Sequence, residues 1–249
     1  MNWTLEYNGV EKTLADFGLA QVRRTLVSQG IDELTFRAVG AAADAAPLFP
    51  YKATVTLWRD RQRDSQGDWS GGTTWFQGLV TQVPRNGSLD AESMAYKVSG
   101  PWWYLENLVF LQAYQQILLG VGAPPGNPVI GSGVSSHLFM NLDSLAPVGP
   151  TLQVGKLTTG QQILAALDWC LAPFLDANTT PPFQIGRITP GVDVPIDEVR
   201  DITCAEVIHK MLRWSPDAVA YFDYTTMPPT FNCLRRAEMA VVNLDASQT

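Results

Sequence analysis

Three stretches of the chain decide its fold: YKATVTLW at residues 51–58, WFQGLVTQV at 75–83 and AYKVSGPWWYLENLVFL at 95–111. Apolar and polar residues alternate along the first stretch and at the start of the third, which is typical of strands with one buried face. Gly78 interrupts the second stretch, and a glycine inside a strand indicates a bulge, a bend or a close backbone approach. We expect these strands to belong to a β-barrel or curled sheet.

The third stretch changes from a strand to a helix at Gly100-Pro101. Proline is well tolerated at a helix start, because its missing N–H would be unbonded there. Residues 102–111 are apolar nearly all round, so we expect a buried helix over this range. Trp102 and Trp103 would point about 100° apart on a helix and could not form one flat platform for a sugar. Core packing of at least one of them is expected.

Two further helices are expected in the last third of the chain. Thr159-x-x-Gln162 and Thr203-x-x-Glu206 each fit a capping box, in which two backbone N–H groups at the helix start find side-chain acceptors. Apolar residues recur at helical spacing after each box, so each helix has one apolar stripe to bury against a sheet. Residues 218–224 and 230–236 predict a hairpin.

Turn residues and polar runs mark the other segments. Residues 2–10 are expected to form a strand that ends at Asn8-Gly9, and residues 34–38 alternate like a strand. The polar, Gly-containing run at 60–74 predicts a mobile connection. Residues 120–155 are rich in Gly, Pro and Ser, so we expect a loop or insertion longer than compact domains usually carry.

Composition and charge bound the function. Hydrophobic residues make up 46% of the 249 residues, enough for a substantial core, and charged residues make up 16%, below the usual ~25%. A sparsely charged surface is typical of subunits covered by neighbours, and equally of single proteins with a large core. The net charge of −7 argues against direct nucleic-acid recognition, which needs clustered Lys and Arg. Arg59, Arg61 and Arg63 alternate with Asp60 and Asp64, which predicts a solvated hairpin tip.

The N-terminal sequence and the cysteines indicate the compartment. The first residues have neither the basic nor the apolar region of a signal peptide, and no run reaches the ~18 apolar residues of a membrane span. Cys170, Cys204 and Cys233 are odd in number and scattered, which favours buried thiols over a disulfide framework. We therefore expect synthesis in a reducing cytoplasm and no membrane span.

No stretch carries a complete enzyme motif. Residues 149–157 and 133–137 come close to a phosphate-binding loop and a nucleophile elbow, but each lacks a residue that the motif requires. No His, Cys and Asp residues show metal-ligand spacing. We expect no catalytic residue, no metal and no cofactor. Trp69, in a polar loop, is the best candidate for an exposed contact residue, with packing inside the loop as the equal alternative.

The order of these signals resembles the tail-hub or baseplate-hub proteins of long-tailed phages and related contractile injection machines. The first matching stretch is VTLWRD followed by WFQGLVTQV, with a Phe-x-Gly-x-Val pattern at Phe76, Gly78 and Val80. The second is AYKVSGPWWYLENLVF, a strand that continues through Pro101 into a Trp-Leu helix. The third is DITCAEVIHKMLRWSPDAVAYFDYTTMPPTFNCLRR, a capped helix followed by a hairpin.

The resemblance implies an α+β, β-rich fold of barrel-like tube domains with helical and loop insertions. Residues 1–100 would form a first tube-like domain, and residues 101–156 the apolar helix and a Gly/Pro-rich insertion. Residues 157–249 would carry the capped helices and hairpin of a second tube-like domain. Because the sequence stops at Thr249, soon after the last predicted strand, the second barrel is incomplete, or the sequence is a piece of a longer protein, or the resemblance is partial.

The resemblance also implies a structural, non-catalytic role. Three copies would form a ring between a six-fold tail tube and a three-fold spike, so the expected partners are two further copies, a tail-tube protein and a spike protein, all in the virion tail. The expected structural residues are Phe76, Gly78, Val80, Pro101, Trp102, Trp103, Thr159, Thr203 and Glu206. Two alternatives stay open: a carbohydrate- or host-binding module that uses Trp69 and the 120–150 loop, and a polysaccharide or cell-wall hydrolase with carboxylates brought from distant positions.

Overall fold

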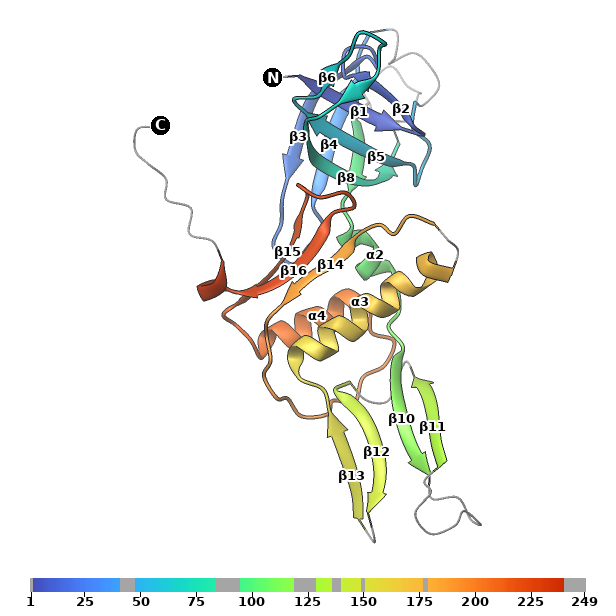
Figure 1. Ribbon diagram of the computed structural model, residues 1–249, viewed down its shortest axis with the longest axis vertical. Coiled ribbons are helices and arrows are strands. Elements are labelled where there is room, and N and C mark those ends of the chain that lie inside the picture. Colours follow the sequence, from blue (N-terminus) through green and yellow to red (C-terminus); the bar gives the residue numbers. More distant parts are fainter. Residues whose placement is uncertain are drawn as a thin grey trace, which may run out of the picture. The chain divides into compact units, whose positions relative to one another are not determined.

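The chain folds as two units that each combine distant stretches of sequence. The computed structural model describes residues 2–40, 48–83, 95–118, 129–135, 140–148, 151–176 and 179–239 (Figure 1). Unit 1 consists of Met1–Leu108, Cys170–Ile185 and Tyr221–Phe231, and unit 2 of Val109–Trp169, Gly186–Ala220 and Asn232–Thr249. The domains predicted from the sequence are instead three consecutive segments.

Unit 1 is built on an antiparallel sheet of seven described strands, in the order β2-β1-β5-β8-β9-β4-β3. These strands are β1 (Trp3–Tyr7), β2 (Val10–Thr13), β3 (Leu19–Thr25), β4 (Glu33–Ala38), β5 (Thr54–Arg59), β8 (Thr73–Gln82) and β9 (Ala95–Ser99). The alternation quoted from 51–58 therefore gives a strand, but that strand begins at Thr54. Tyr51 lies before it with 58% of its surface exposed.

An aromatic cluster shows how this sheet curves. The Phe49 ring contacts Tyr7 on β1, Phe36 on β4 and Tyr96 on β9, with ring centroids 5.4, 5.8 and 5.3 Å apart. Because β1 and β4 lie near opposite ends of the strand order, a single residue can touch both only where the sheet is curled. No described pairing joins β2 to β3, so the β-rich prediction is confirmed while the sheet is curled without closing into a barrel.

The first hairpin follows from its turn residues. Asn8 and Gly9 both have positive φ, 51° and 71°, and they connect Tyr7 of β1 to its partner Val10 of β2. Two positive φ values in a two-residue loop match the twist of paired strands, which explains the Asn-Gly sequence. The predicted strand at 2–10 is therefore the two strands of a hairpin.

The helix after β9 is shorter than predicted. α2 spans Trp102–Asn107, with Pro101 at its N-cap position, and Trp102 and Leu105 are its buried residues. The backbone is extended from Leu108, and Val109 forms a bridge with Thr203. The apolar run that predicted a helix to residue 111 thus ends as extended chain, in which the Phe110 N–H donates to the Ile202 carbonyl oxygen at 2.9 Å; Phe110 is buried, while Val109 is 43% exposed.

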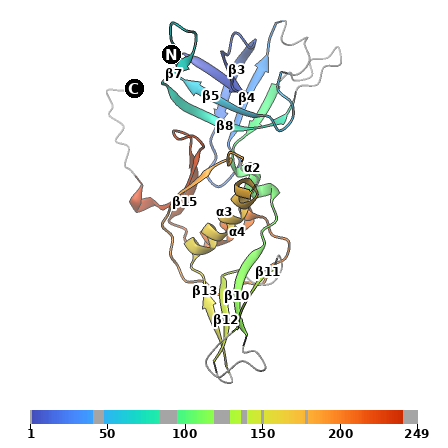
Figure 2. The ribbon, with the colours of Figure 1, turned by 45° about the vertical axis from the view of Figure 1, so that its right-hand side comes forward.

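Unit 2 contains a second sheet where a long loop was expected. Its order is β11-β10-β12-β13, from β10 (Gln112–Leu118), β11 (Val129–Ser135), β12 (Leu142–Val148) and β13 (Thr151–Lys156). β10 and β11 run side by side as an antiparallel pair in Figures 1 and 2. The prediction of a loop over 120–155 was wrong for β11, β12 and β13, and residues 119–128, 136–139 and 149–150 lie outside the described part of the chain.

Two helices and a three-stranded sheet complete the fold. α3 spans Thr159–Asp176 and α4 spans Cys204–Arg213. The sheet has the order β14-β16-β15, from β14 (Gln184–Ile188), β15 (Ala218–Asp223) and β16 (Thr230–Arg235), and a 3₁₀ turn, η1 (Arg236–Glu238), follows. The predicted C-terminal hairpin is confirmed. The division between units passes through α3 and through all three of these strands.

Candidate functional site: the core around Tyr224

A buried hydrogen bond in unit 1 joins two residues that are 192 positions apart. The Tyr224 hydroxyl donates to Asp32 Oδ2 at 2.8 Å, and the Val27 N–H donates to Asp32 Oδ1 at 2.6 Å. Asp32 and Tyr224 are 4% and 5% exposed. Each Asp32 oxygen thus has a donor, as a buried carboxylate requires.

Two other residues confine Tyr224. Its ring stacks on Phe76 of β8, with centroids 4.9 Å apart and an interplanar angle of 15°. Gly100 lies beside the hydroxyl, and a Cβ at Gly100 would come within 3.0 Å of it. The Gly100 N–H also donates to the Asp32 carbonyl oxygen at 2.8 Å. Glycine at position 100 therefore leaves the space that the Asp32–Tyr224 bond occupies.

Gly78 is a second position of close approach. A Cβ there would come within 3.0 Å of the Ser99 carbonyl oxygen on the neighbouring strand β9, and backbone cannot move aside as a flexible side chain can. The register of β8 shifts on either side, opposite Leu57/Trp58 and after Val80. The close-approach alternative is therefore the one observed at Gly78, and the bulges flank it.

Trp102 joins α2 to the C-terminal hairpin within unit 1. It is 1% exposed, and its ring packs against Phe222 and Phe231 at centroid distances of 6.5 and 6.3 Å. Trp103 is half-buried, with the Lys52 ammonium 5.4 Å from its ring centroid. The two indoles thus have different surroundings, as their helical spacing predicts. Val80, from the Phe-x-Gly-x-Val pattern, is fully buried.

Burial dominates the electrostatics of this core. It raises the pKa of Asp32 above its ordinary value of 3.8, although the hydrogen bonds from Val27 and Tyr224 act in the opposite direction. It also raises the pKa of Tyr224, and the Asp32 charge adds to that effect. Tyr224 therefore stays a neutral donor at physiological pH, which suits a structural bond.

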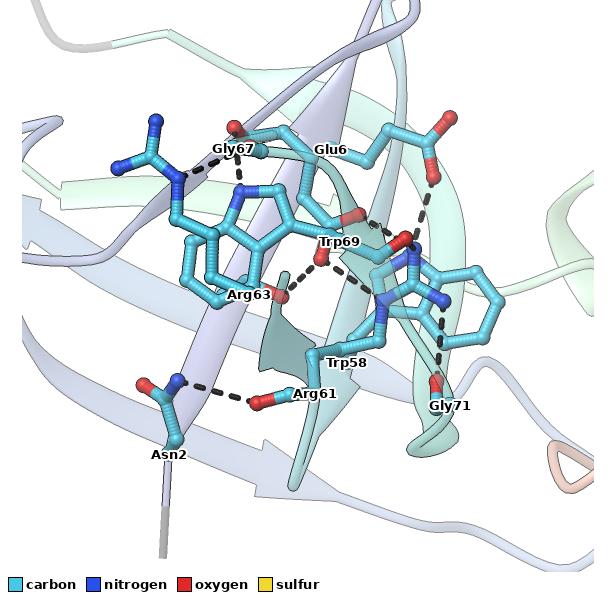
Figure 3. Close-up of polar contacts among 10 residues, drawn as sticks. Asn2, Glu6, Trp58, Arg61, Arg63, Gly67, Trp69 and Gly71 are labelled. Carbon is cyan, nitrogen blue, oxygen red and sulfur yellow. Dashed lines mark hydrogen bonds and ion pairs between the residues drawn. The ribbon is translucent and has the colours of Figure 1, made fainter. Parts of the chain in front are cut away.

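The hairpin predicted as mobile and solvated is tied to the sheet. β6 (Gln62–Arg63) pairs with β7 (Trp69–Ser70). Arg61 makes two hydrogen bonds to the Glu11 carboxylate, at 2.6 and 3.0 Å, and one to the Gly71 carbonyl oxygen at 2.9 Å (Figure 3). Its side chain is only 16% exposed. The clustered charges predicted a solvated tip because the sequence does not reveal that Glu11 lies against Arg61.

Trp69 is part of this tied hairpin. Its indole N–H donates to the Glu11 carbonyl oxygen at 3.1 Å, and the residue is half-buried. Arg63 lies with its guanidinium 5.7 Å from the Trp69 ring centroid, and Figure 3 draws the two residues beside each other. Of the two alternatives for Trp69, these contacts match packing inside the loop.

Of the two predicted capping boxes, the one at α4 is confirmed and the one at α3 lies one residue earlier than predicted. At α4 the Glu206 N–H donates to Thr203 Oγ1 at 3.2 Å, and the Thr203 N–H donates to the Glu206 carboxylate at 2.7 Å. At α3 the reciprocal pair is Thr158 and Gln161, at 3.4 and 2.9 Å. The predicted Thr159–Gln162 pair was wrong by one residue.

Thr159 and Gln162 have buried roles instead, all within unit 2. Thr159 Oγ1 accepts from the Val192 N–H at 3.1 Å and lies 3.4 Å from Ser215 Oγ. Gln162 Oε1 accepts from the Asn141 N–H at 2.7 Å. Both residues are fully buried. Two Thr-x-x-Gln patterns overlap here. The Thr159–Gln162 pair is buried and bonds to other segments, so the Thr158–Gln161 pair forms the capping box.

Sequence reasoning missed Asp32 and Tyr224. Tyr224 continues the alternation of buried residues along β15, and a phenol on a buried face needs a hydrogen-bond partner, so half of the pair carried a signal. Asp32 carried none, since it lies in a short polar segment before β4.

Two searches of the described residues found nothing. No group of three or more His, Cys, Asp or Glu side chains in them could hold a metal ion. None of the helices in that same part of the chain is both long and apolar enough to cross a membrane.

Comparison with known proteins gives a structural likeness and no sequence family. No family model matches the chain, and neither does any curated protein. Among solved structures, the chain is similar to the 43 kDa tail protein of prophage MuSo2 from Shewanella oneidensis, with a TM-score of 0.46 and 15% identity. The match covers 94% of this chain and 53% of the tail protein, so the chain spans about half of that protein's length.

Proposed function

We propose that this chain is a structural, non-catalytic subunit of a phage tail or tail-like injection machine. In this proposal it is a baseplate hub that forms a homotrimer and joins the tail tube to the spike in the virion tail. The proposal rests on features of this chain: the three stretches whose order resembles hub proteins, and the packing of those stretches.

One observation carries the proposal. Phe76 comes from the first of the three stretches, Trp102 from the second, and Phe222 and Tyr224 from the third. In unit 1, Phe76 stacks on Tyr224, and Trp102 packs against Phe222. Segments more than a hundred residues apart thus meet in one buried core, and the contacts between them are the aromatic packing of a structural framework. This supports the view that the shared pattern specifies a building block.

The edges of the seven-stranded sheet support assembly. β2 and β3 are the outermost of its described strands. On β2 the Glu11 carbonyl oxygen already accepts from the Trp69 indole, so a further strand could pair only with the remaining outward backbone groups. Apolar side chains are exposed at both edges: Val10 on β2 is 50% exposed, and Leu26, directly after β3, is 53% exposed. Lateral pairing with another subunit would cover such edges.

Electron microscopy of the purified chain at high concentration tests the proposal. We expect rings with three-fold symmetry, and attachment of those rings to tail-tube protein when the two are mixed. Val10→Lys should lower the fraction of rings, because lysine on an edge strand opposes addition of another strand. Leu175→Lys is the control, since Leu175 is 72% exposed and lies on the helix α3 and not on a strand. Single subunits with no rings and no attachment would contradict the proposal.

A further inference from the structure

Unit 1 contains a cleft that the proposed structural role does not use. Its volume is about 530 Å³, within the range of small-ligand sites, and every residue that lines it belongs to unit 1. Gly78 and Pro101 are part of its lining, but Trp69 is not.

The floor of the cleft is a row of polar side chains across three strands. Glu6 on β1 pairs with Thr56 on β5, and Thr56 pairs with Gln77 on β8. Residues opposite each other on neighbouring strands point to the same face, about 4.8 Å apart. The row therefore places a carboxylate, a hydroxyl and an amide at regular spacing, and one oxygen of the Glu6 carboxylate accepts from the Trp58 indole N–H at 3.0 Å.

Gln77 provides a second, independent sign of a ligand. It is 9% exposed, and its Oε1 atom is buried with no hydrogen-bond partner among the described residues. A buried acceptor with no donor costs roughly 1–3 kcal/mol, so native proteins rarely leave one without a reason. A donor group of a bound molecule at the cleft floor would satisfy it.

The walls combine aromatic rings with donors. Tyr51 is 58% exposed and Tyr104 is half-buried, so their rings offer flat apolar surface to a ligand. Burial raises the pKa of Tyr104 to about 12, which keeps its hydroxyl protonated at neutral pH. Asn8 and Lys52 also line the cleft and add polar groups.

From this arrangement we infer that the cleft binds a neutral oligosaccharide. Sugar hydroxyls both donate and accept, so one hydroxyl can serve Gln77 Oε1 and Thr56 together. The C–H faces of the sugar rings would lie on Tyr51 and Tyr104. Glu6 and Lys52 line the cleft with opposite charges, so the lining has no net charge that would select a charged sugar.

A proline-rich peptide is the competing occupant, because aromatic grooves also bind such segments. Proline has no backbone N–H. A proline-rich segment therefore has few donors to offer Gln77 Oε1, and the polar floor favours the saccharide.

Calorimetric titration of the full chain tests the inference. The probes are cellotriose, maltotriose and triacetylchitotriose, with a proline-rich decapeptide as the competing class. We expect at least one saccharide to bind, and Gln77→Leu and Tyr51→Ala each to weaken binding about tenfold, close to the effect of one lost hydrogen bond or stacking contact. Trp214→Ala is the matched control for Tyr51→Ala, since Trp214 is 53% exposed and does not line the cleft.

Thermal unfolding separates loss of the site from loss of the fold. Gln77→Leu removes an unsatisfied polar atom, so its melting temperature should equal or exceed that of the wild type. The inference is overturned if no probe saccharide binds at millimolar concentration, if binding ignores both cleft variants, or if only the peptide binds. None of these outcomes bears on ring formation, so the structural proposal is tested separately.

Discussion

At the scale of single residues, Tyr224 and Gly78 hold together segments of unit 1 that lie far apart in the sequence. Tyr224 reaches Asp32 through its hydroxyl and Phe76 through its ring. Gly78 lets β8 approach the Ser99 carbonyl oxygen more closely than any side chain would permit. The role of Tyr224 depends on its phenolic oxygen, and the role of Gly78 depends on the absence of a Cβ. Their contributions can therefore be tested by small substitutions.

Gly78→Ala should lower the free energy of unfolding by about 2–4 kcal/mol, and Gly78→Val by at least as much, because the added Cβ would overlap backbone of β9. Urea unfolding measures this. Gly191→Ala is the matched control, since a Cβ at Gly191 meets nothing within 4 Å, and its effect should stay within about 0.5 kcal/mol. Equal effects at the two glycines would refute the close approach.

Tyr224→Phe should destabilise the fold by about 1–3 kcal/mol, because it leaves Asp32 Oδ2 buried without its donor while the ring stacking on Phe76 persists. Chemical denaturation of the variant checks this. Tyr221→Phe, which removes a hydroxyl from the half-buried neighbour on β15, should change stability far less. If Tyr224→Phe leaves the stability unchanged, the Tyr224–Asp32 hydrogen bond contributes nothing to stability.

The buried Asp32 predicts a particular pH dependence. Its raised pKa means that the folded state binds this proton more tightly than the unfolded chain does, so its contribution to stability is greatest below about pH 3.8 and is lost as pH rises through the folded pKa. Asp32→Asn does not titrate there. The stability of wild type minus that of Asp32→Asn should therefore fall as pH rises above 4 in denaturation experiments. A difference that grows with pH would show that hydrogen bonding outweighs burial.

At the scale of elements, sequence patterns correctly predicted those strands and helix starts that depend on neighbouring residues. Alternation located β5, β9, β15 and β16, and the Thr203–Glu206 box located the start of α4. β3 was missed because it carries polar residues on an edge of the sheet. β11 was missed because its sequence, VIGSGVS, is rich in glycine and serine, which normally indicate loops.

The core and the cleft were harder to predict from the sequence than these strands. Phe76, Gly78 and Trp102 stood out by pattern, and all three are part of the core. Asp32 and Gln77 did not, since a buried aspartate and an unpartnered glutamine become visible only when distant strands are placed side by side. The surroundings of both residues depend on the pairing of strands that lie far apart in the sequence, and short sequence patterns do not predict such pairing.

The corrected capping box can be tested at α3. Thr158→Ala and Gln161→Ala should each cost about 1 kcal/mol, and the double variant should cost less than their sum, because the two side chains bond to each other's backbone. Thermal unfolding of the three variants measures the coupling. Strict additivity would show that the reciprocal pair does not form.

At the scale of the whole molecule, the proposed role would make the chain a framework whose sheet edges neighbouring subunits complete. The low fraction of charged residues and the exposed apolar side chains at β2 and after β3 suit a surface that other subunits cover. The cleft would then give such a framework a contact with a sugar chain that is independent of assembly.

Light scattering across a range of protein concentrations is the measurement that best tests whether the chain assembles with itself. We expect a mass that rises with concentration toward three times the 27.3 kDa of one chain. The Val10→Lys variant should show this rise only at higher concentration, and Leu175→Lys should behave like the wild type. A mass that stays at one chain over the whole range, with tail-tube protein present or absent, would contradict the hub proposal.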